Sequence, residues 1–244
     1  MKNILREYTN RPLNILTEST HEAYQSNAFG GLPHNFYMLQ HQHSKPWVSN
    51  FRPVPDNHHF IKSLPNGVDI DLILCQTRFN QPKMLYPLAK QLRVPIIQLE
   101  HTAPMTHWDL KSRKALAEIR GNANIFITKW SKAAWGFAED KSSIVIYHGI
   151  DTELFKPLEK KNHVLTVVND FKNRGGICGY NTWCNVTNGI DSVVVGDTPG
   201  VSKAAESPEA LARHYGEAAI YLNTSTLSPV PTSMMEAMSA GCRS

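Results

Sequence analysis

The sequence lacks several features that would assign it to a class at once. No run of residues approaches the roughly eighteen apolar positions that a membrane-spanning helix needs, and the start lacks the apolar core of a signal peptide. The cysteines, Cys75, Cys178, Cys184 and Cys242, have neither zinc-ligand nor disulfide-framework spacing, so we expect free thiols. These absences indicate a soluble globular protein, which we expect in the cytoplasm.

A dense stripe of Lys and Arg with interleaved aromatic residues is missing as well. The formal charge of +4 and the pI near 8.8 are only mildly basic. Such a charge suits an anionic small molecule or peripheral contact with a lipid-phosphate surface, but it is too small to indicate DNA or RNA binding. The histidines of residues 40–65 lack a carboxylate–histidine helix pattern, so we expect no metal site. They are His41, His43, His58 and His59.

What the sequence contains is an alternation of short apolar runs and helix-period stretches. This pattern is typical of parallel sheets flanked by helices, and 41% hydrophobic residues among 244 supply enough apolar material for two small cores. Residues 40–65 are expected to be mostly loop and residues 152–162 a linker, because charge and proline interrupt the pattern there. The predicted strands are 13–16, 36–39, 70–75, 94–99, 125–128, 143–147, 164–168, 192–195 and 219–222, and the predicted helices are 21–28, 82–92, 109–120, 129–138, 178–186, 207–216 and 232–240.

The most informative segment is 228–241, where a short loop with two prolines runs into the last predicted helix. A helix start leaves several backbone N–H groups unpaired and carries about half a positive charge, so it attracts phosphate. A carboxylate such as Glu236 can accept hydrogen bonds from both hydroxyls of a ribose. The segment therefore suits a nucleotide, while an ordinary amphipathic helix capped by Thr232 or Ser233 is the simpler alternative.

A second segment points the same way. Residues 144–151 read Ile-Val-Ile-Tyr-His-Gly-Ile-Asp, and Phe155, Lys156 and Pro157 follow. Together the two segments resemble the retaining nucleotide-sugar glycosyltransferases of the GT-B fold, in particular glycosyltransferase family 4. In that family a small-Gly-Ile/Val-Asp turn followed by Phe-x-Pro leads from the acceptor domain into the donor domain. A Glu-Ala-Met-x-x-Gly helix start then binds the donor nucleotide.

This resemblance implies an α/β protein with two Rossmann-like domains, an acceptor-side domain over residues 1–150 and a nucleotide-sugar donor domain over residues 151–244. Because the family continues beyond the position of Ser244, we expect the second domain to be incomplete. The implied enzyme is a metal-independent hexosyltransferase that moves a sugar from a UDP or GDP donor, with retention, to a glycan, lipid or protein acceptor. The nucleotide sugar is a substrate, and no bound cofactor is expected.

The resemblance also implies how the donor diphosphate is held. The two cations that clamp it in the family correspond here to Asn169 and Arg174, so only the second is cationic. The planar guanidinium of Arg174 can still pair with phosphate, and Gly175 stands where the family has glycine after its lysine. A solvated turn with incidental charge is the simpler alternative for this segment.

The donor loop departs from the family in a similar way. Its two glutamates, eight positions apart, correspond to Ser228 and Glu236, so the first carboxylate is absent. The resemblance implies that Glu236 binds the donor ribose. Backbone N–H groups around Ser233, Met234 and Met235 would then face the phosphates or the sugar, while the two methionine side chains serve packing.

Residues outside the donor domain complete the predicted site. His101 closes a predicted strand where many family members place a histidine that faces the sugar, and we predict that it hydrogen-bonds a sugar hydroxyl. A histidine satisfied at the edge of the sheet is the alternative. His148, Gly149 and Asp151 form the predicted interdomain turn, with Gly149 present for its backbone conformation and Asp151 as a cap or linker residue.

Another class of function stays open at this point. The missing glutamate, the missing cation and the expected incompleteness of the second domain also fit a non-catalytic sugar-nucleotide or partner-binding remnant of such an enzyme. An incomplete domain would expose apolar surface, which makes self-association an expectation. An epimerase on the same fold is disfavoured because paired carboxylates are not evident. The base, sugar and acceptor are not specified by the sequence.

Overall fold

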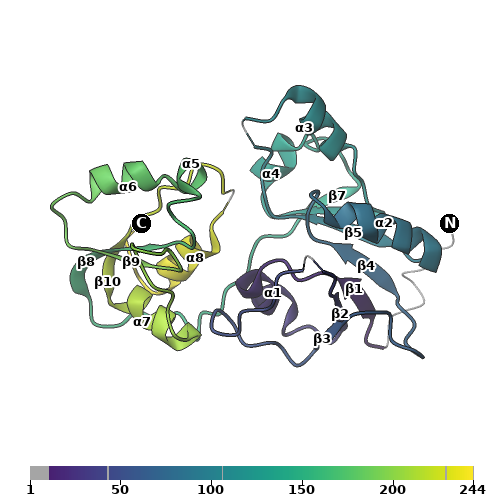
Figure 1. The fold of residues 1–244 in the computed structure, drawn as a ribbon, viewed down its shortest axis with the longest axis horizontal. Coiled ribbons are helices and arrows are strands. Elements are labelled where there is room, and N and C mark those ends of the chain that lie inside the picture. The colour runs from purple at the N-terminus through teal and green to yellow at the C-terminus, as the bar shows by residue number, and fades with distance from the viewer. Residues whose placement is uncertain (1–10, 43, 106, 229, 244) are drawn as a thin grey trace. The chain divides into compact units, whose positions relative to one another are not determined.

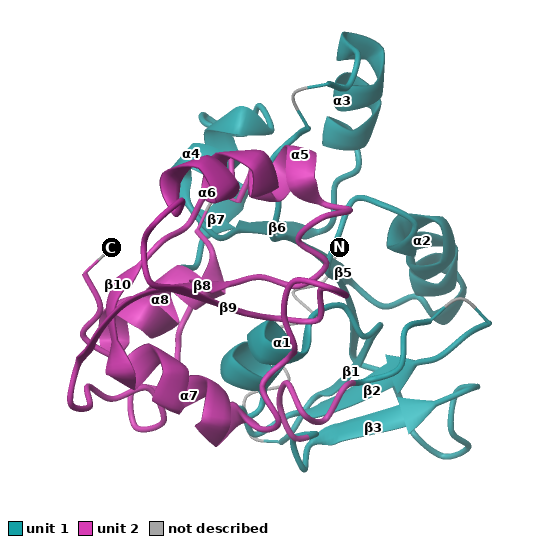
Figure 2. Cartoon of the chain, turned by 60° about the vertical axis from the view of Figure 1, so that its left-hand side comes forward, with its two compact units in different colours: residues 1–47, 54–147 teal, residues 48–53, 148–244 magenta. Residues whose placement is uncertain are grey.

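The structure is a computed structural model that describes residues 11–42, 44–105, 107–228 and 230–243. The chain divides into two compact units, shown in different colours in Figure 2. Unit 1 contains Met1–Trp47 and Val54–Tyr147, and unit 2 contains Val48–Pro53 and His148–Ser244. A six-residue segment from within the sequence of unit 1 thus belongs to unit 2.

Unit 1 is built on a seven-stranded sheet in which all paired strands run parallel, in the order β3-β2-β1-β4-β5-β6-β7. The order reverses direction between β1 and β4, which in doubly wound sheets is where ligands bind at the carboxyl ends of the strands. The strands are β1 (Asn14–Thr17), β2 (Asn35–Leu39), β3 (His58–Ile61), β4 (Leu72–Cys75), β5 (Ile96–Glu100), β6 (Ala123–Phe126) and β7 (Ser143–Val145).

The connections of unit 1 carry the helices α1 (Glu22–Phe29), α2 (Gln81–Leu92), α3 (Leu110–Ala117) and α4 (Lys129–Ala134). Helix α2 begins with Pro82 in its first turn, buries Leu85 and Ala89, and packs against β4 (Figure 1). Helix α4 begins with a reciprocal capping box between Thr128 and Ser131. An apolar inner face therefore fixes α2 on the sheet, and a polar cap fixes the start of α4.

Unit 2 contains a three-stranded parallel sheet in the order β10-β8-β9, made by β8 (Lys161–Val167), β9 (Ser192–Val195) and β10 (Ala218–Tyr221). Its helices are α5 (Gly175–Cys178), α6 (Tyr180–Val186), α7 (Pro208–Glu217) and α8 (Thr232–Ser239). Helices α7 and α8 contact each other and carry much of the core, in which Phe155, Leu165 and Tyr215 have no exposed surface. Arg243 pairs with β10 through backbone hydrogen bonds to Ala219 and Tyr221.

The predicted fold class is confirmed: the protein is α/β, with two Rossmann-like units built on parallel sheets. The described part of residues 40–65 is mostly loop, as predicted, but residues 58–61 form β3, which the prediction missed. That segment starts with two histidines and therefore does not read as a strand. It is recruited by parallel pairing with β2 and by stacking of His58 on Phe36, with ring centroids 5.2 Å apart.

Two further predictions need correction at their bounds. The helix predicted over residues 178–186 is present but begins at Tyr180, because Gly179 adopts the left-handed conformation (φ +73°) between α5 and α6. Strand β8 begins at Lys161, within the predicted linker, since it pairs there with β10. His43, Pro229 and Ser244 lie outside the described residues. Within the described part of the chain, no helix is long and apolar enough to cross a membrane.

Candidate functional site

The carboxyl ends of β8 and β9 are tied together by side chains that follow them. The backbone N–H of Asp170 donates to the Asp197 carboxylate at 3.0 Å, and the N–H of Asp197 donates to Asn169 Oδ1 at 3.2 Å. Asp170 has a positive φ of 52°, and the N–H of Phe171 donates to Thr198 Oγ1 at 2.8 Å. Asn169, a predicted donor-binding residue, therefore joins two loops at this edge of the sheet.

Arg174 lies just beyond this junction, at the N-cap position of α5, with Gly175 as the first helical residue. Its guanidinium donates to the Asn169 carbonyl at 3.3 Å, and its side chain is exposed to solvent. The structure thus brings Asn169, Arg174 and Gly175 together at the carboxyl edge of the unit 2 sheet. An exposed guanidinium at this edge can receive an anion without a burial cost.

The loop after β10 reaches the same edge. Thr224 Oγ1 donates to the Cys178 carbonyl at 2.7 Å, and the N–H of Thr226 donates to the Ile177 carbonyl at 2.9 Å. Gly179 lies so close to Thr224 that a Cβ at this position would collide with the Thr224 carbonyl. The loops that follow β8 and β10 are therefore packed as one structure.

Helix α8 begins where the sequence predicts, but the alternative of a cap from Thr232 or Ser233 is wrong. Pro231 occupies the N-cap position, and no side chain of the described residues accepts a hydrogen bond from this start. Ser233 Oγ instead accepts a hydrogen bond from the Tyr221 hydroxyl at 2.7 Å. Proline is a poor cap because it offers no acceptor side chain, so the positive end of the α8 dipole is not neutralised from within the described residues.

The other residues of this helix start differ in exposure. Ser228 is exposed, whereas Met234 and Met235 are half-buried. Met234 packs against the core of unit 2, as the sequence predicts for its side chain. Glu236 is 3% exposed, and its Oε1 atom lies 2.5 Å from Nη2 of Arg52. Burial raises the pKa of Glu236, while the charge of Arg52 opposes that shift.

Arg52, the partner of Glu236, is the residue at this helix that sequence reasoning missed. It comes from the segment Val48–Pro53 and lies 184 positions before Glu236 in the sequence. Its neighbours Phe51 and Pro53 are apolar. An arginine between apolar residues in a polar loop is the sequence feature that could have indicated a buried arginine. That signal names no partner, because an ion pair at such a separation depends on the fold.

In unit 1, His101 follows the last residue of β5. Its ring meets the ring of Tyr24 edge-on, with centroids 4.0 Å apart, which joins it to α1. The two residues that flank His101 are fixed: Thr102 donates to Glu100 Oε1 from its backbone N–H at 3.0 Å and from its hydroxyl at 2.7 Å. The predicted sugar-contacting histidine is therefore held on a rigid turn at the carboxyl edge of the unit 1 sheet.

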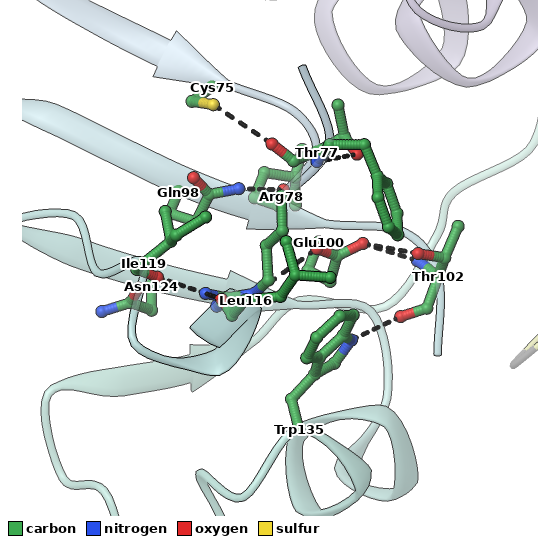
Figure 3. A network of polar contacts seen from close by, with 12 residues as sticks. Cys75, Thr77, Arg78, Gln98, Glu100, Thr102, Leu116, Ile119, Asn124 and Trp135 are labelled. Atoms are coloured by element: carbon green, nitrogen blue, oxygen red, sulfur yellow. Dashed lines mark hydrogen bonds and ion pairs between the residues drawn. The ribbon is translucent and has the colours of Figure 1, made fainter. Parts of the chain in front are cut away.

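A buried network supports this turn (Figure 3). Nε of Arg78 lies 3.4 Å from Glu100 Oε2, and neither side chain has exposed surface. The Arg78 guanidinium packs over the rings of Trp135 and Phe137, with centroids at 5.2 and 4.9 Å. Trp135 Nε1 donates to the Thr102 carbonyl at 2.8 Å. Burial raises the pKa of Glu100, and the nearby guanidinium and the hydrogen bonds of Thr102 oppose this.

Polar residues also gather where β1 and β2 end. Glu18 follows β1, and its carboxylate lies 3.3 Å from His41 Nε2. A shallow hollow of about 390 Å³ lies beside this pair, lined by Gln40, His41, Gln42, Ser44, Pro46 and Lys62. Burial raises the pKa of Glu18, and the contact with His41 opposes that shift. This hollow offers amide, hydroxyl and cationic groups to a polar ligand.

The residues of the predicted interdomain turn are His148, Gly149 and Asp151, and hydrogen bonds within this segment involve Asp151. Asp151 Oδ1 accepts from the N–H groups of Glu153 at 2.9 Å and Leu154 at 3.1 Å, so Asp151 acts as a cap. Gly149 is exposed and does not lie among the residues with a positive φ. His148 is half-buried. The expected conformational role of Gly149 is therefore wrong.

The four cysteines are free thiols, as predicted. They are Cys75, Cys178, Cys184 and Cys242, and all but Cys184 are buried. Among the residues that the structure describes, no group of three or more His, Cys, Asp or Glu side chains could hold a metal ion. His58 and His59 lie in β3, where burial lowers the pKa of His58 to about 4.

Comparison with solved structures identifies a protein of similar fold. No family model matches the sequence, and no curated protein matches it. Among solved structures, the protein is similar to Anabaena Alr3699/HepE in complex with UDP-glucose, with a TM-score of 0.58 and 13% sequence identity. The match covers 94% of this chain and 79% of that chain. The two proteins therefore share a fold of paired parallel α/β units.

Proposed function

We propose that the protein binds a nucleotide diphosphate sugar at the carboxyl edge of the unit 2 sheet and transfers the sugar to an acceptor. The observation that carries this proposal is the start of α8, which no side chain within the described ranges caps, in a fold similar to a protein bound to UDP-glucose. Exposed Arg174 at the same sheet edge adds a cation for the diphosphate.

In this proposal the protein acts by positioning and by charge stabilisation. The guanidinium of Arg174 and the first N–H groups of α8 stabilise the negative charge that develops on the departing diphosphate. His101 contacts a hydroxyl of the transferred sugar, and Glu236 accepts from the ribose. Retention at the anomeric carbon, independence of a metal ion, membership of glycosyltransferase family 4 and a cytoplasmic location belong to the same proposal. So does the division into an acceptor domain that ends near residue 150 and a donor domain that follows it.

Calorimetric titration with UDP, GDP and UDP-glucose tests the donor site. We expect Arg174→Ala to weaken binding of the diphosphates about tenfold or more, because a charge-assisted contact is lost. Arg213→Ala is the matched control, since Arg213 is exposed on α7 of the same unit. Equal binding by the wild type and both variants would contradict the placement of the diphosphate. Hydrolysis of a panel of UDP-, GDP- and ADP-sugars then identifies the donor.

Two observations favour a second candidate function, that of a non-catalytic sugar-nucleotide or partner-binding protein. Ser228 stands where a carboxylate would act, and Glu236 is engaged by Arg52. Binding of UDP-glucose without hydrolysis or transfer to glycan, lipid or protein acceptors would support this candidate. Light scattering after size exclusion tests the self-association that it includes, for which exposed Ile220 and Met238 offer apolar surface.

A further inference from the structure

Three polar side chains lie within the apolar core of unit 2. Arg52 is 4% exposed, Glu236 is 3% exposed and Tyr215 is fully buried. The core around them includes Phe155, which has no exposed surface. Charged groups are rarely placed in such surroundings, because removal from water costs several kcal/mol for each ion unless it is paired. This cluster therefore calls for a reason other than stability.

The geometry fixes the direction of the Arg52 guanidinium. Nη2 lies 2.5 Å from Glu236 Oε1, and Nη1 donates to the Phe51 carbonyl at 2.7 Å. The guanidinium carbon lies 5.2 Å from the centroid of the Phe155 ring. With one nitrogen on the carboxylate, another on the backbone and its face on a ring, the guanidinium holds Glu236 in one orientation.

The third member of the cluster is the hydroxyl of Tyr215, which is fully buried and interacts with the Glu236 carboxylate. A buried carboxylate needs such polar contacts, because it has lost those it would make with water. Arg52 and Tyr215 thus act on the same carboxylate from within the core.

We propose that Arg52 is a positioning residue of the donor site, which holds Oε1 of Glu236 so that the carboxylate accepts the ribose hydroxyls of the nucleotide. This inference rests on the proposed function. Under it, the segment Val48–Pro53 is part of the donor site, although it lies far from the rest of that site in sequence. The Arg52–Glu236 pair makes recognition specific for ribose over deoxyribose. An acceptor oxygen held in one orientation binds the 2′-hydroxyl of ribose, and deoxyribose lacks that donor.

The test compares UDP-glucose with its 2′-deoxyuridine analogue by calorimetry. We expect the wild type to prefer the ribose form at least tenfold, and Arg52→Met and Glu236→Gln to reduce that ratio towards one. Arg52→Lys keeps the charge without the fork and should give an intermediate ratio. Lys161→Met is the control for loss of a cation, because Lys161 is paired at the exposed surface with Glu217.

Each outcome separates the inference from the function on which it rests. Failure of the wild type to bind either ligand would overturn the proposed function. Binding by the wild type with a ratio that Arg52→Met and Arg52→Lys leave unchanged would make Arg52 purely structural and overturn the inference. Where Arg52→Met does not fold, Arg52→Lys decides in the same way.

A measurement on the wild type distinguishes positioning from displacement. The guanidinium protons of Arg52 are visible in side-chain ¹⁵N NMR spectra when a buried ion pair protects them from exchange. We expect the protected signals to persist when UDP is added, because Arg52 and the ribose use the carboxylate together. Loss of these signals on UDP binding would mean that the nucleotide displaces Arg52, and the positioning role would be wrong.

Discussion

Arg78 and Glu100 form an ion pair that is completely enclosed in unit 1, with Nε and Oε2 3.4 Å apart. The guanidinium also donates to the carbonyls of Leu116 and Ile119, which join the end of α3 to the sheet. Glu100 in turn holds Thr102. The pair therefore couples the α3 region to the turn that carries His101 (Figure 3).

Breaking this pair from one side should be costly. Glu100→Leu or Arg78→Met leaves its partner buried without a counter-charge, and we expect a loss of about 3–5 kcal/mol in the free energy of unfolding. Urea denaturation measures the loss. The double variant Arg78→Met with Glu100→Leu should lose less than the sum of the single variants. Additive losses would contradict a direct interaction between the two side chains.

The turn around His101 can be loosened without an unpaired buried charge. Thr102→Val removes the hydroxyl that donates to Glu100, and Trp135→Phe removes the indole donor to the Thr102 carbonyl. Each should cost about 1 kcal/mol of stability. We also expect the NMR contact between the His101 and Tyr24 rings to weaken in Thr102→Val. An unchanged ring contact would show that the network stabilises unit 1 without orienting His101.

The contact of Asp71 with Arg11 predicts a pH dependence. Asp71 accepts from Arg11 at 2.6 and 2.8 Å and from the N–H of Asn14 at 2.8 Å. The hydrogen bond with Arg11, followed by that with Asn14, holds the pKa of Asp71 below its ordinary value of 3.8. Its ionised form therefore stabilises the fold above pH 3.8, and this contribution is lost as the pH falls through the lowered pKa.

We accordingly expect Asp71→Asn to lose about 1–2 kcal/mol of stability at pH 7 and progressively less as the pH falls below 3.8. Arg11 is half exposed, so solvent screening keeps the loss at the lower end of the range for charged hydrogen bonds. Denaturation of both proteins at a series of pH values gives the comparison. A difference that stays constant into the acid range would assign the loss to packing.

How far the sequence predicts this structure depends on the range of the interactions involved. Strands such as Leu72–Cys75 were predictable because a short apolar run between breakers specifies a buried strand locally. Strand His58–Ile61 was not, because its pairing with β2 outweighs its own polar start. Glu236 was found through a local pattern at a helix start, whereas its partner Arg52 comes from a distant loop. The donor-binding roles of these residues stay predictions until a ligand is measured.

Two glycines provide the last prediction, which concerns the edge where the donor is proposed to bind. Gly179 and Gly189 both have a left-handed backbone, with φ of +73° and +76°. A Cβ at Gly189 would meet no atom within 4 Å, whereas one at Gly179 would meet the backbone of Thr224. Gly189→Ala should therefore cost only the conformational strain, about 1 kcal/mol.

Gly179→Ala should lose clearly more stability than Gly189→Ala. The conformational strain is the same, but the added Cβ also clashes with Thr224 and pushes α5 away from the loop after β10. Urea denaturation of the two variants isolates the steric part, since their backbone conformations match. We further expect UDP binding to weaken only in Gly179→Ala, because Arg174 stands on the helix that the clash moves. Equal stability of the two variants would show that Thr224 moves aside without a loss of stability. Normal UDP binding by a destabilised Gly179→Ala would place the diphosphate away from α5.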